Sequence, residues 1–298
     1  MKISIIIPSF NQGQYLEETI NSVLNQNSVD LEIIVNDGGS SDNSLDILNK
    51  YSKSIKWKSE SDYGQTDAIN RGIYQSSGDI IAYLNSDDIY YPNILKKVHD
   101  YFESNQDCSI IYGNAHHIKG DGSFLEKYPT QIWDYYKLFE TCYICQPSVF
   151  WLKEIHQKYG YFDERLHYAM DYEFWLRIGK TNRFDYINDE PFAGSRLHAQ
   201  NKTLSQRVPA HEEILKIVKL YAEESSQTYT WIRNLASLKA LKDGYSPSEN
   251  TLIQGKFVNK YVNYIQSLCY EHSININDRF KDELSTLLKH FPSEIYSK

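Results

Sequence analysis

Over the first 112 residues, short runs of apolar, mostly β-branched residues alternate with longer stretches in which apolar residues recur at helical spacing. The apolar runs predict five buried strands, at Ile3–Ile7, Leu31–Val35, Ile55–Lys58, Ile80–Leu84 and Ile110–Tyr112. The stretches between them predict amphipathic helices. Strands and helices that alternate through short links predict an α/β fold, with a parallel sheet and right-handed crossovers.

The pattern changes after this region. Gly120–Gly122 predicts a hairpin turn between two short strands, and Gln146–Phe150 predicts a further strand. Pro92 favours the first turn of a helix after the fourth strand, and another helix is predicted to start at Asp171. From Pro209 onward the spacing is helical. We therefore expect a main α/β domain over residues 1–208 and a helical C-terminal extension over residues 209–298.

Charge is distributed unevenly between these two parts. The 298 residues have a net charge of −8, and the whole acidic excess, 28 acidic against 20 basic side chains, lies in residues 1–209. This balance argues against a general nucleic-acid binder and against a polybasic membrane anchor. It fits a protein that meets polyphosphates through a metal ion, because carboxylates alone would repel them.

The chain shows few features of a secreted or membrane-spanning protein. Its first apolar run stops at Pro8, which is too short for a signal peptide, and no stretch has the length of a membrane span. Four cysteines are too few for a disulfide scaffold. We expect a cytoplasmic protein. Peripheral contact with the inner face of the plasma membrane stays open, although the C-terminal part has no obvious basic stripe.

Polar residues gather where the predicted strands end. Ser9, Phe10 and Asn11 follow the first strand and Asp37 the second. The remaining members of the group, after the third and fourth strands, are Glu60, Asp62, Asp87 and Asp88. Ligands of open α/β sheets bind beyond the carboxyl ends of the strands, so these residues form a candidate site.

Four features could carry chemistry, and each has a structural alternative. Asp87 and Asp88 suit a hard divalent cation, but could also cap the following helix. Asp171 could be a general base or an N-cap. His198 could be a metal ligand or an ordinary surface or core histidine. Cys142 and Cys145 have the spacing of half a zinc site or a redox pair, and we interpret them as two half-buried thiols.

Six segments resemble, in order, those of family 2 glycosyltransferases, enzymes with the GT-A fold. They are Ile3–Gly13 (ISIIIPSFNQG), Asn36–Asp42 (NDGGSSD), Glu60–Gly72 (ESDYGQTDAINRG), Asn85–Asp88 (NSDD), Gln146–Ser148 (QPS) and Met170–Trp175 (MDYEFW). The resemblance covers roughly residues 1–200 and departs from the family's D-x-D pattern at Asn85. It implies a mixed, mostly parallel sheet flanked by helices, with residues 1–208 as the catalytic domain.

The resemblance also implies an activity and a set of site residues. The activity is inverting transfer of a sugar from a nucleotide diphosphate donor, UDP by family frequency, with Mn²⁺ or Mg²⁺. Asp171 would be the catalytic base. Asp87, Asp88 and His198 would hold the metal. The residues implied to bind the nucleotide are Pro8, Phe10, Asn11, Asp37, Asp62, Asp67, Asp87 and Arg196, the last through phosphate.

The resemblance further implies the partners. They are a nucleotide-sugar donor and a saccharide or lipid-linked acceptor, as in bacterial surface polysaccharide synthesis. The C-terminal helices could serve acceptor binding, a lipid surface or self-association. Two alternatives stay open: a sugar nucleotidyltransferase, and a non-catalytic subunit of the same fold that scaffolds a partner enzyme.

Overall fold

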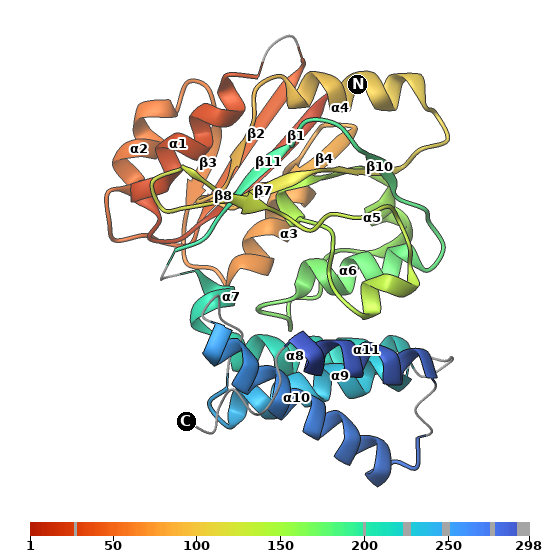
Figure 1. Ribbon diagram of the computed structural model, residues 1–298. Coiled ribbons are helices and arrows are strands. Elements are labelled where there is room, and N and C mark those ends of the chain that lie inside the picture. Colours follow the sequence, from red (N-terminus) through yellow and green to blue (C-terminus); the bar gives the residue numbers. More distant parts are fainter. Residues whose placement is uncertain (27–28, 199–200, 223–227, 246–250, 275–277, 291–298) are drawn as a thin grey trace. The chain divides into compact units, whose positions relative to one another are not determined.

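Figure 1 shows the computed structural model of the chain. The structure describes residues 1–26, 29–198, 201–222, 228–245, 251–274 and 278–290. It divides into two compact units, Met1–Leu204 and Ser205–Lys298. The division lies four residues before the domain boundary that the sequence suggested, ahead of helix α8 (Arg207–Ala222).

The first unit is built on a sheet in the strand order β10-β6-β9-β4-β1-β2-β3. The strands are β1 (Ile3–Ser9), β2 (Leu31–Asp37), β3 (Lys56–Ser59), β4 (Ile80–Tyr83), β6 (Ile110–Gly113), β9 (Val149–Leu152) and β10 (Asp185–Ile187). Only β9 runs antiparallel to its neighbours β4 and β6 in this sheet. The predicted α/β class and the five N-terminal strands are confirmed, with boundaries shifted by one or two residues.

A second, smaller sheet follows the order β5-β11-β7-β8. Its strands are β5 (Ile89–Tyr90), β7 (Ala115–Ile118), β8 (Phe124–Lys127) and β11 (Ala193–Arg196). The antiparallel pair β7–β8 confirms the hairpin predicted at Gly120–Gly122. Strand β11 pairs with β5, so Ala193 lies opposite Tyr90 and Gly194 opposite Ile89. This pairing brings the chain just after Asp88 beside the chain just before His198.

Helices cover both faces of the large sheet because its strands are apolar on both sides. The helices of the first unit are α1 (Gly13–Leu24), α2 (Ser44–Tyr51), α3 (Gln65–Gln75), α4 (Ile94–Ser104), α5 (Glu154–Tyr159) and α6 (Met170–Gly179), and α7 (Lys202–Ser205) spans the division between the units. Ile5 and Ile7 of β1 pack with α1 in one core cluster. Ile6 points to the other face, where Gly72 of α3 approaches so closely that a Cβ there would lie 2.4 Å from it.

Two local predictions were wrong, each for a conformational reason. Helix α4 begins at Ile94, not at Pro92, because Asn93 adopts a left-handed conformation with φ of 65° that no right-handed helix accommodates. Gln146–Ser148 forms a single 3₁₀ turn, and the strand starts only at Val149. The proline at position 147 fixes φ and removes a ladder donor, which suits a turn better than a strand.

The second unit contains the helices α8, α9 (Thr228–Lys242), α10 (Thr251–Glu271) and α11 (Asp278–His290). Its core is formed by Ile232, Ala236, Val262, Ile265 and Leu268, among others. The predicted helical extension is therefore a separately packed helical unit. None of the helices in the described part of the chain is both long and apolar enough to span a lipid bilayer.

Candidate active site

The centre of the candidate site is a contact between Asp87 and His198. Asp87 lies in the turn that connects β4 to β5, and His198 follows β11 by two residues. His198 Nε2 is 2.9 Å from Asp87 Oδ2, and only 8% and 14% of the two side chains is exposed. The β5–β11 pairing explains how residues so distant in sequence meet. The structure therefore brings together two of the three predicted metal ligands.

The third predicted metal ligand, Asp88, has hydrogen-bond partners of its own. Its Oδ1 accepts the main-chain N–H of Arg196 at 2.8 Å, and its Oδ2 accepts the Asn85 amide at 3.1 Å. Burial and then the charge of Asp87 raise the pKa of Asp88 well above its usual range. Because its oxygens already serve protein donors, Asp88 anchors the end of β11. Among the described residues no cluster of three or more His, Cys, Asp or Glu side chains could hold a metal.

Arg196, which was predicted to face phosphate, has several partners within the protein. Its side chain is fully buried, and the guanidinium donates to the Asp87 carbonyl at 2.6 Å, the Gly120 carbonyl at 3.0 Å and Glu18 Oε2 at 2.7 Å. A group that faced phosphate would need free donors directed toward the ligand. These donors go to protein acceptors here, and a contact of Arg196 with phosphate stays a prediction.

Asn85, where the family pattern has its first Asp, belongs to a network of amides. Its Oδ1 accepts from Gln65 Nε2 at 2.7 Å, and its Nδ2 donates to Asp88 and, at 3.3 Å, to Gln146 Oε1. Gln146 in turn donates to the Tyr83 carbonyl at the end of β4. An amide can donate and accept at once, whereas an ionised Asp could only accept. Asparagine therefore suits this position near the carboxylates of Asp87 and Asp88.

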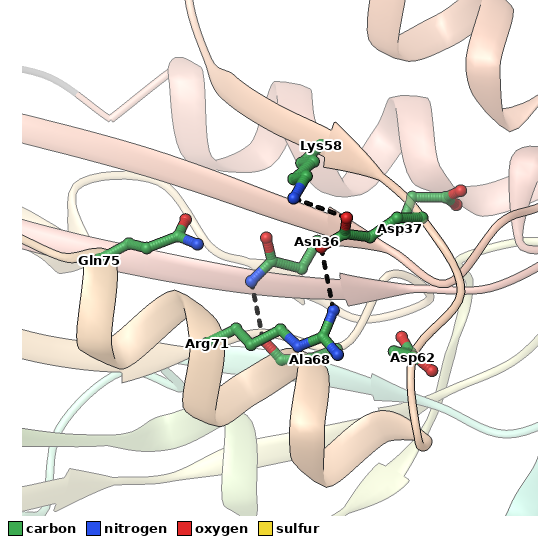
Figure 2. A pocket seen from close by; sticks show the side chains of 8 residues that line it. Asn36, Asp37, Lys58, Asp62, Ala68, Arg71 and Gln75 are labelled. Atoms are coloured by element: carbon green, nitrogen blue, oxygen red, sulfur yellow. Dashed lines mark hydrogen bonds and ion pairs between the residues drawn. The ribbon is translucent and has the colours of Figure 1, made fainter.

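The predicted nucleotide residues border one end of the large sheet. Figure 2 shows a pocket between β2, β3 and α3 that is lined by Asn36, Asp37, Lys58, Glu60, Asp62, Ala68, Arg71 and Gln75. Asp37 ends β2, and Asp62 follows β3. Gly38 gives Asp62 its room, because a Cβ on that glycine would lie 2.9 Å from Asp62 Oδ2.

Most of these carboxylates already have protein partners. Asp37 is buried and accepts from the main-chain N–H groups of Gly39 and Ser40 and from the hydroxyl of Ser59, at 2.6–3.1 Å. Asp67 pairs with Arg71 at 2.7 Å and does not line the pocket. Asp67 therefore orients the arginine, and Asp37 fixes the turn after β2.

The chain just beyond the end of β1 is more exposed than the strand itself. Pro8 is buried in β1 opposite Asn36, whereas Phe10 is 59% exposed. Asn11 has a positive φ of 52°, and its side-chain oxygen accepts the N–H of Ser41 at 2.9 Å. This contact joins the loops that follow β1 and β2. An exposed ring beside these loops provides a surface on which a nucleobase can stack.

Asp171 lies in the first turn of α6, and its carboxylate accepts the N–H of Tyr172 at 2.8 Å. The N-cap position belongs to Ala169, so Asp171 is not the N-cap that the sequence left as an alternative. Burial, and after it the charge of Asp171, raises the pKa values of Tyr83 and Cys142. Asp171 is half-buried and remains accessible to a ligand.

The two cysteines are structural thiols. Cys142 is partly exposed and Cys145 buried, and both are free. Burial, followed by the charge of Asp171, raises the pKa of Cys142 to about 12. A thiol that stays protonated is a poor metal ligand and a poor nucleophile. Cys142 fits the interpretation as a half-buried thiol, whereas Cys145 is more deeply buried than expected.

Sequence reasoning missed Glu18, Tyr15 and Gln65. The ring of Tyr15 lies 4.9 Å from the His198 ring and 4.9 Å from the guanidinium carbon of Arg196. Glu18 and Tyr15 lie on a helix whose apolar spacing drew attention to the core face only. Gln65 lies inside a quoted motif, but nothing in the motif indicates its bond to Asn85.

Comparison with known proteins identifies the family of this chain. The model of "Glycosyl transferase family 2" matches residues 4–160, more than half of the chain. The chain belongs to this family. An uncharacterized glycosyltransferase of Rickettsia prowazekii is 28% identical over 92% of both chains. The hyaluronan synthase of Pasteurella multocida is 26% identical over 68% of this chain but only 21% of its own length.

Solved structures of other proteins are similar in fold to this chain. Staphylococcus aureus TarS in complex with UDP-GlcNAc superposes with a TM-score of 0.62 and 17% identity, over 89% of this chain and 81% of that one. The Pyrobaculum calidifontis mannosyltransferase PcManGT, in complex with GDP-Man and Mn²⁺, gives 0.59 and 11% identity, over 100% and 88%. The glycosyltransferase has the GT-A fold, as the six motifs implied.

Proposed function

We propose that this glycosyltransferase transfers a sugar from a nucleotide diphosphate donor to an acceptor hydroxyl with inversion at the anomeric carbon. The observation that carries the proposal is the Asp87–His198 pair, which lies at the end of β4 and β11 where α/β sheets bind ligands. UDP-sugars are the first candidates for the donor, because the comparison structure of TarS contains UDP-GlcNAc. The GDP-Man in PcManGT keeps GDP-sugars as the second.

The residues present fit a divalent cation. One carboxylate and one imidazole, both mostly buried, offer an oxygen and a nitrogen donor in direct contact. Mg²⁺ and similar ions often bind one or two protein groups and take further oxygens from substrate phosphates. The imidazole favours a transition metal, so Mn²⁺ fits the pair better than Mg²⁺. When bound, such an ion stabilises the negative charge that develops on the departing diphosphate.

The remaining residues would position the donor and remove a proton. The exposed ring of Phe10 stacks the base, and the surface beside Asp37 and Asp62 contacts the rest of the nucleoside. Asp171 accepts the proton of the acceptor hydroxyl as its oxygen attacks the anomeric carbon from the face opposite the leaving group. Holding the hydroxyl and the leaving group in line supplies a large part of the rate.

Polysaccharide synthesis is the setting that we propose for this activity. By their names, the hyaluronan synthase and the chondroitin synthase of Pasteurella multocida, which resemble this chain over 68% and 62% of its length, make polymers of sugars. We propose a growing saccharide or a lipid-linked oligosaccharide of a bacterial surface polymer as acceptor.

The first experiment is a calorimetric titration of UDP, GDP and dTDP into the full chain, with Mn²⁺, with Mg²⁺ and with EDTA. Metal-dependent binding of one diphosphate is the expected result, and sugar donors with that base are then tested for transfer. If no nucleotide binds in any buffer, the proposal fails, and the scaffold alternative takes its place.

A second experiment tests the base. The change Asp171→Asn keeps the size of the side chain but removes its basicity, so transfer should fall by about 10²–10⁴-fold. Nucleotide binding should stay within twofold or so of the original. The matched control is Asp100→Asn, which changes an exposed aspartate of α4 and should leave transfer unchanged. Full transfer by Asp171→Asn would exclude Asp171 as the base.

A further inference from the structure

Arg196 holds together three segments around the proposed metal site. Its Nε donates to the carbonyl of Asp87, one terminal nitrogen to the carbonyls of Lys119 and Gly120, and the other to Glu18. These partners belong to the β4–β5 turn, the β7–β8 hairpin and helix α1. One planar side chain therefore joins the loop of Asp87 to two independent parts of the fold.

Because Arg196 is buried, changing its contacts should destabilise the protein. The side chain is 0% exposed, whereas its ion-pair partner Glu18 is 51% exposed. A buried charge that loses its partner destabilises a protein strongly. A lysine could not replace these contacts, because its single ammonium lacks the fork of donors that reaches acceptors on several sides. The guanidinium is thus held where it is, and turning toward a ligand would break several bonds at once.

The same residue contacts the surroundings of Asp87 and of His198. Its side chain fixes the carbonyl of Asp87, and its main-chain N–H fixes Asp88. His198 follows two residues later, and its ring lies against Tyr15, which also contacts the Arg196 guanidinium. A change in Arg196 would therefore shift Asp87 and His198 relative to each other.

We propose that Arg196, clamped by Glu18, is a positioning residue that sets the mutual placement of Asp87 and His198 and makes no contact with the donor phosphates. The inference rests on the proposed function because that function supplies the metal. The contact between Asp87 and His198 is present in the protein without a metal. It predicts that Glu18, which lies on α1 and outside the pocket, affects metal binding through Arg196.

The test compares Glu18→Gln, Arg196→Lys and the control Glu17→Gln in the full chain. Glu17 is the neighbouring carboxylate on α1 and pairs with Lys50 instead. Two quantities are measured: the affinity for Mn²⁺ with saturating UDP, and the imidazole chemical shifts of His198 in the metal-free protein by NMR. Uridine binding and thermal unfolding report on the nucleoside pocket and on folding.

Support requires that Glu18→Gln and Arg196→Lys both weaken Mn²⁺ binding by about 10–100-fold, the usual cost of losing an outer-shell partner. Both should also shift the His198 signals, with uridine affinity unchanged and Glu17→Gln like the original protein. Glu18 is half exposed, so Glu18→Gln keeps the test valid even if Arg196→Lys does not fold.

Two results would overturn the inference. One is a normal Mn²⁺ affinity and unshifted His198 signals in Glu18→Gln. The other is an Arg196→Lys protein that loses affinity for UDP but keeps its Mn²⁺ affinity and His198 signals, because that pattern belongs to a phosphate contact. If the original protein binds no nucleotide with any metal, the proposed function fails, and the His198 signals still decide the positioning role.

Discussion

Carboxylates are buried at both ends of the large sheet, but they are held in opposite ways. At the amino ends of the strands, Glu32 accepts from the Ser4 hydroxyl at 2.6 Å, the Ser77 N–H at 2.7 Å and the Lys56 ammonium at 2.6 Å. Burial raises its pKa, but these hydrogen bonds, that of Lys56 first, outweigh burial and lower the pKa to about 2. This carboxylate is stable as an anion in the folded protein.

At the carboxyl ends, Asp88 has the reverse balance. Burial and the neighbouring charge of Asp87 raise its pKa despite bonds from Arg196 and Asn85. Two carboxylates side by side are costly to fold, and a bound cation relieves that cost. Buried charges that are satisfied internally serve the fold, whereas crowded ones at a ligand-binding edge indicate function. Four predictions test this contrast.

The largest effect is expected for Asp87→Asn. Asparagine keeps the size of the side chain but removes the anion that a cation needs, so transfer should fall by about 100-fold or more. The free energy of unfolding should stay equal or rise, because Asp88 loses a like-charged neighbour. Initial rates of transfer and urea unfolding of the same preparation measure both. A loss of stability equal to that of a core mutation would mean that Asp87, like Glu32, serves the fold.

Glu32→Gln should have the opposite effect, with lower stability and unchanged transfer. It removes a buried charge that makes several hydrogen bonds, so the free energy of unfolding should fall by about 1–3 kcal/mol. Transfer per folded molecule should not change, because Glu32 lies at the amino ends of the strands. Urea unfolding and initial rates again provide the measurement. Lost activity in fully folded protein would show that the two ends are not independent.

The contribution of Glu32 should also depend on pH. Its pKa is lower in the folded chain, so the unfolded chain binds a proton first as the pH falls. The stability difference between the original protein and Glu32→Gln should therefore be complete above the ordinary glutamate pKa of 4.5 and shrink toward about 2. Unfolding of both proteins in matched buffers from neutral to acid pH checks this. A difference that grows on acidification contradicts it.

The smallest effect is expected for Tyr15→Leu. The ring contacts both the Arg196 guanidinium and His198, and a cation–π contact of this kind is worth about 0.5–2 kcal/mol. Mn²⁺ affinity with UDP should fall by about 2- to 30-fold, whereas Tyr15→Phe, which keeps the ring, should match the original protein. Calorimetry measures both. Equal losses in the two variants would point to the hydroxyl instead.

Much of the fold could be predicted from the sequence, because hydrophobic period and turn residues act locally. The strands from Ile3 to Tyr112 and the Gly120–Gly122 hairpin follow from such local signals. The antiparallel insertion of β9 between β4 and β6 could not be predicted, because strand order depends on the packing of distant segments.

The candidate site was predictable in its members but not in their contacts. Asp87 and His198 were expected together, through the resemblance, and they do meet. Arg196 and Asp88 were also assigned to ligands through the resemblance. Only the structure reveals that both are buried, with Asp88 accepting from protein donors and Arg196 donating to protein acceptors. Residue type indicates what a side chain can bind, whereas its partners in the fold decide what it does bind.

The distance of 111 positions from Asp87 to His198 along the chain also sets the time at which the two can meet during synthesis. At about 5–20 residues per second, a ribosome needs roughly 6–22 s to reach the histidine after it has made the aspartate. Until then β5 has no β11 to pair with, and the acidic turn exists without its imidazole. The β5–β11 contact is thus among the last to form in the first unit. A nascent chain cannot assemble the Asp87–His198 pair before nearly all of that unit has been made.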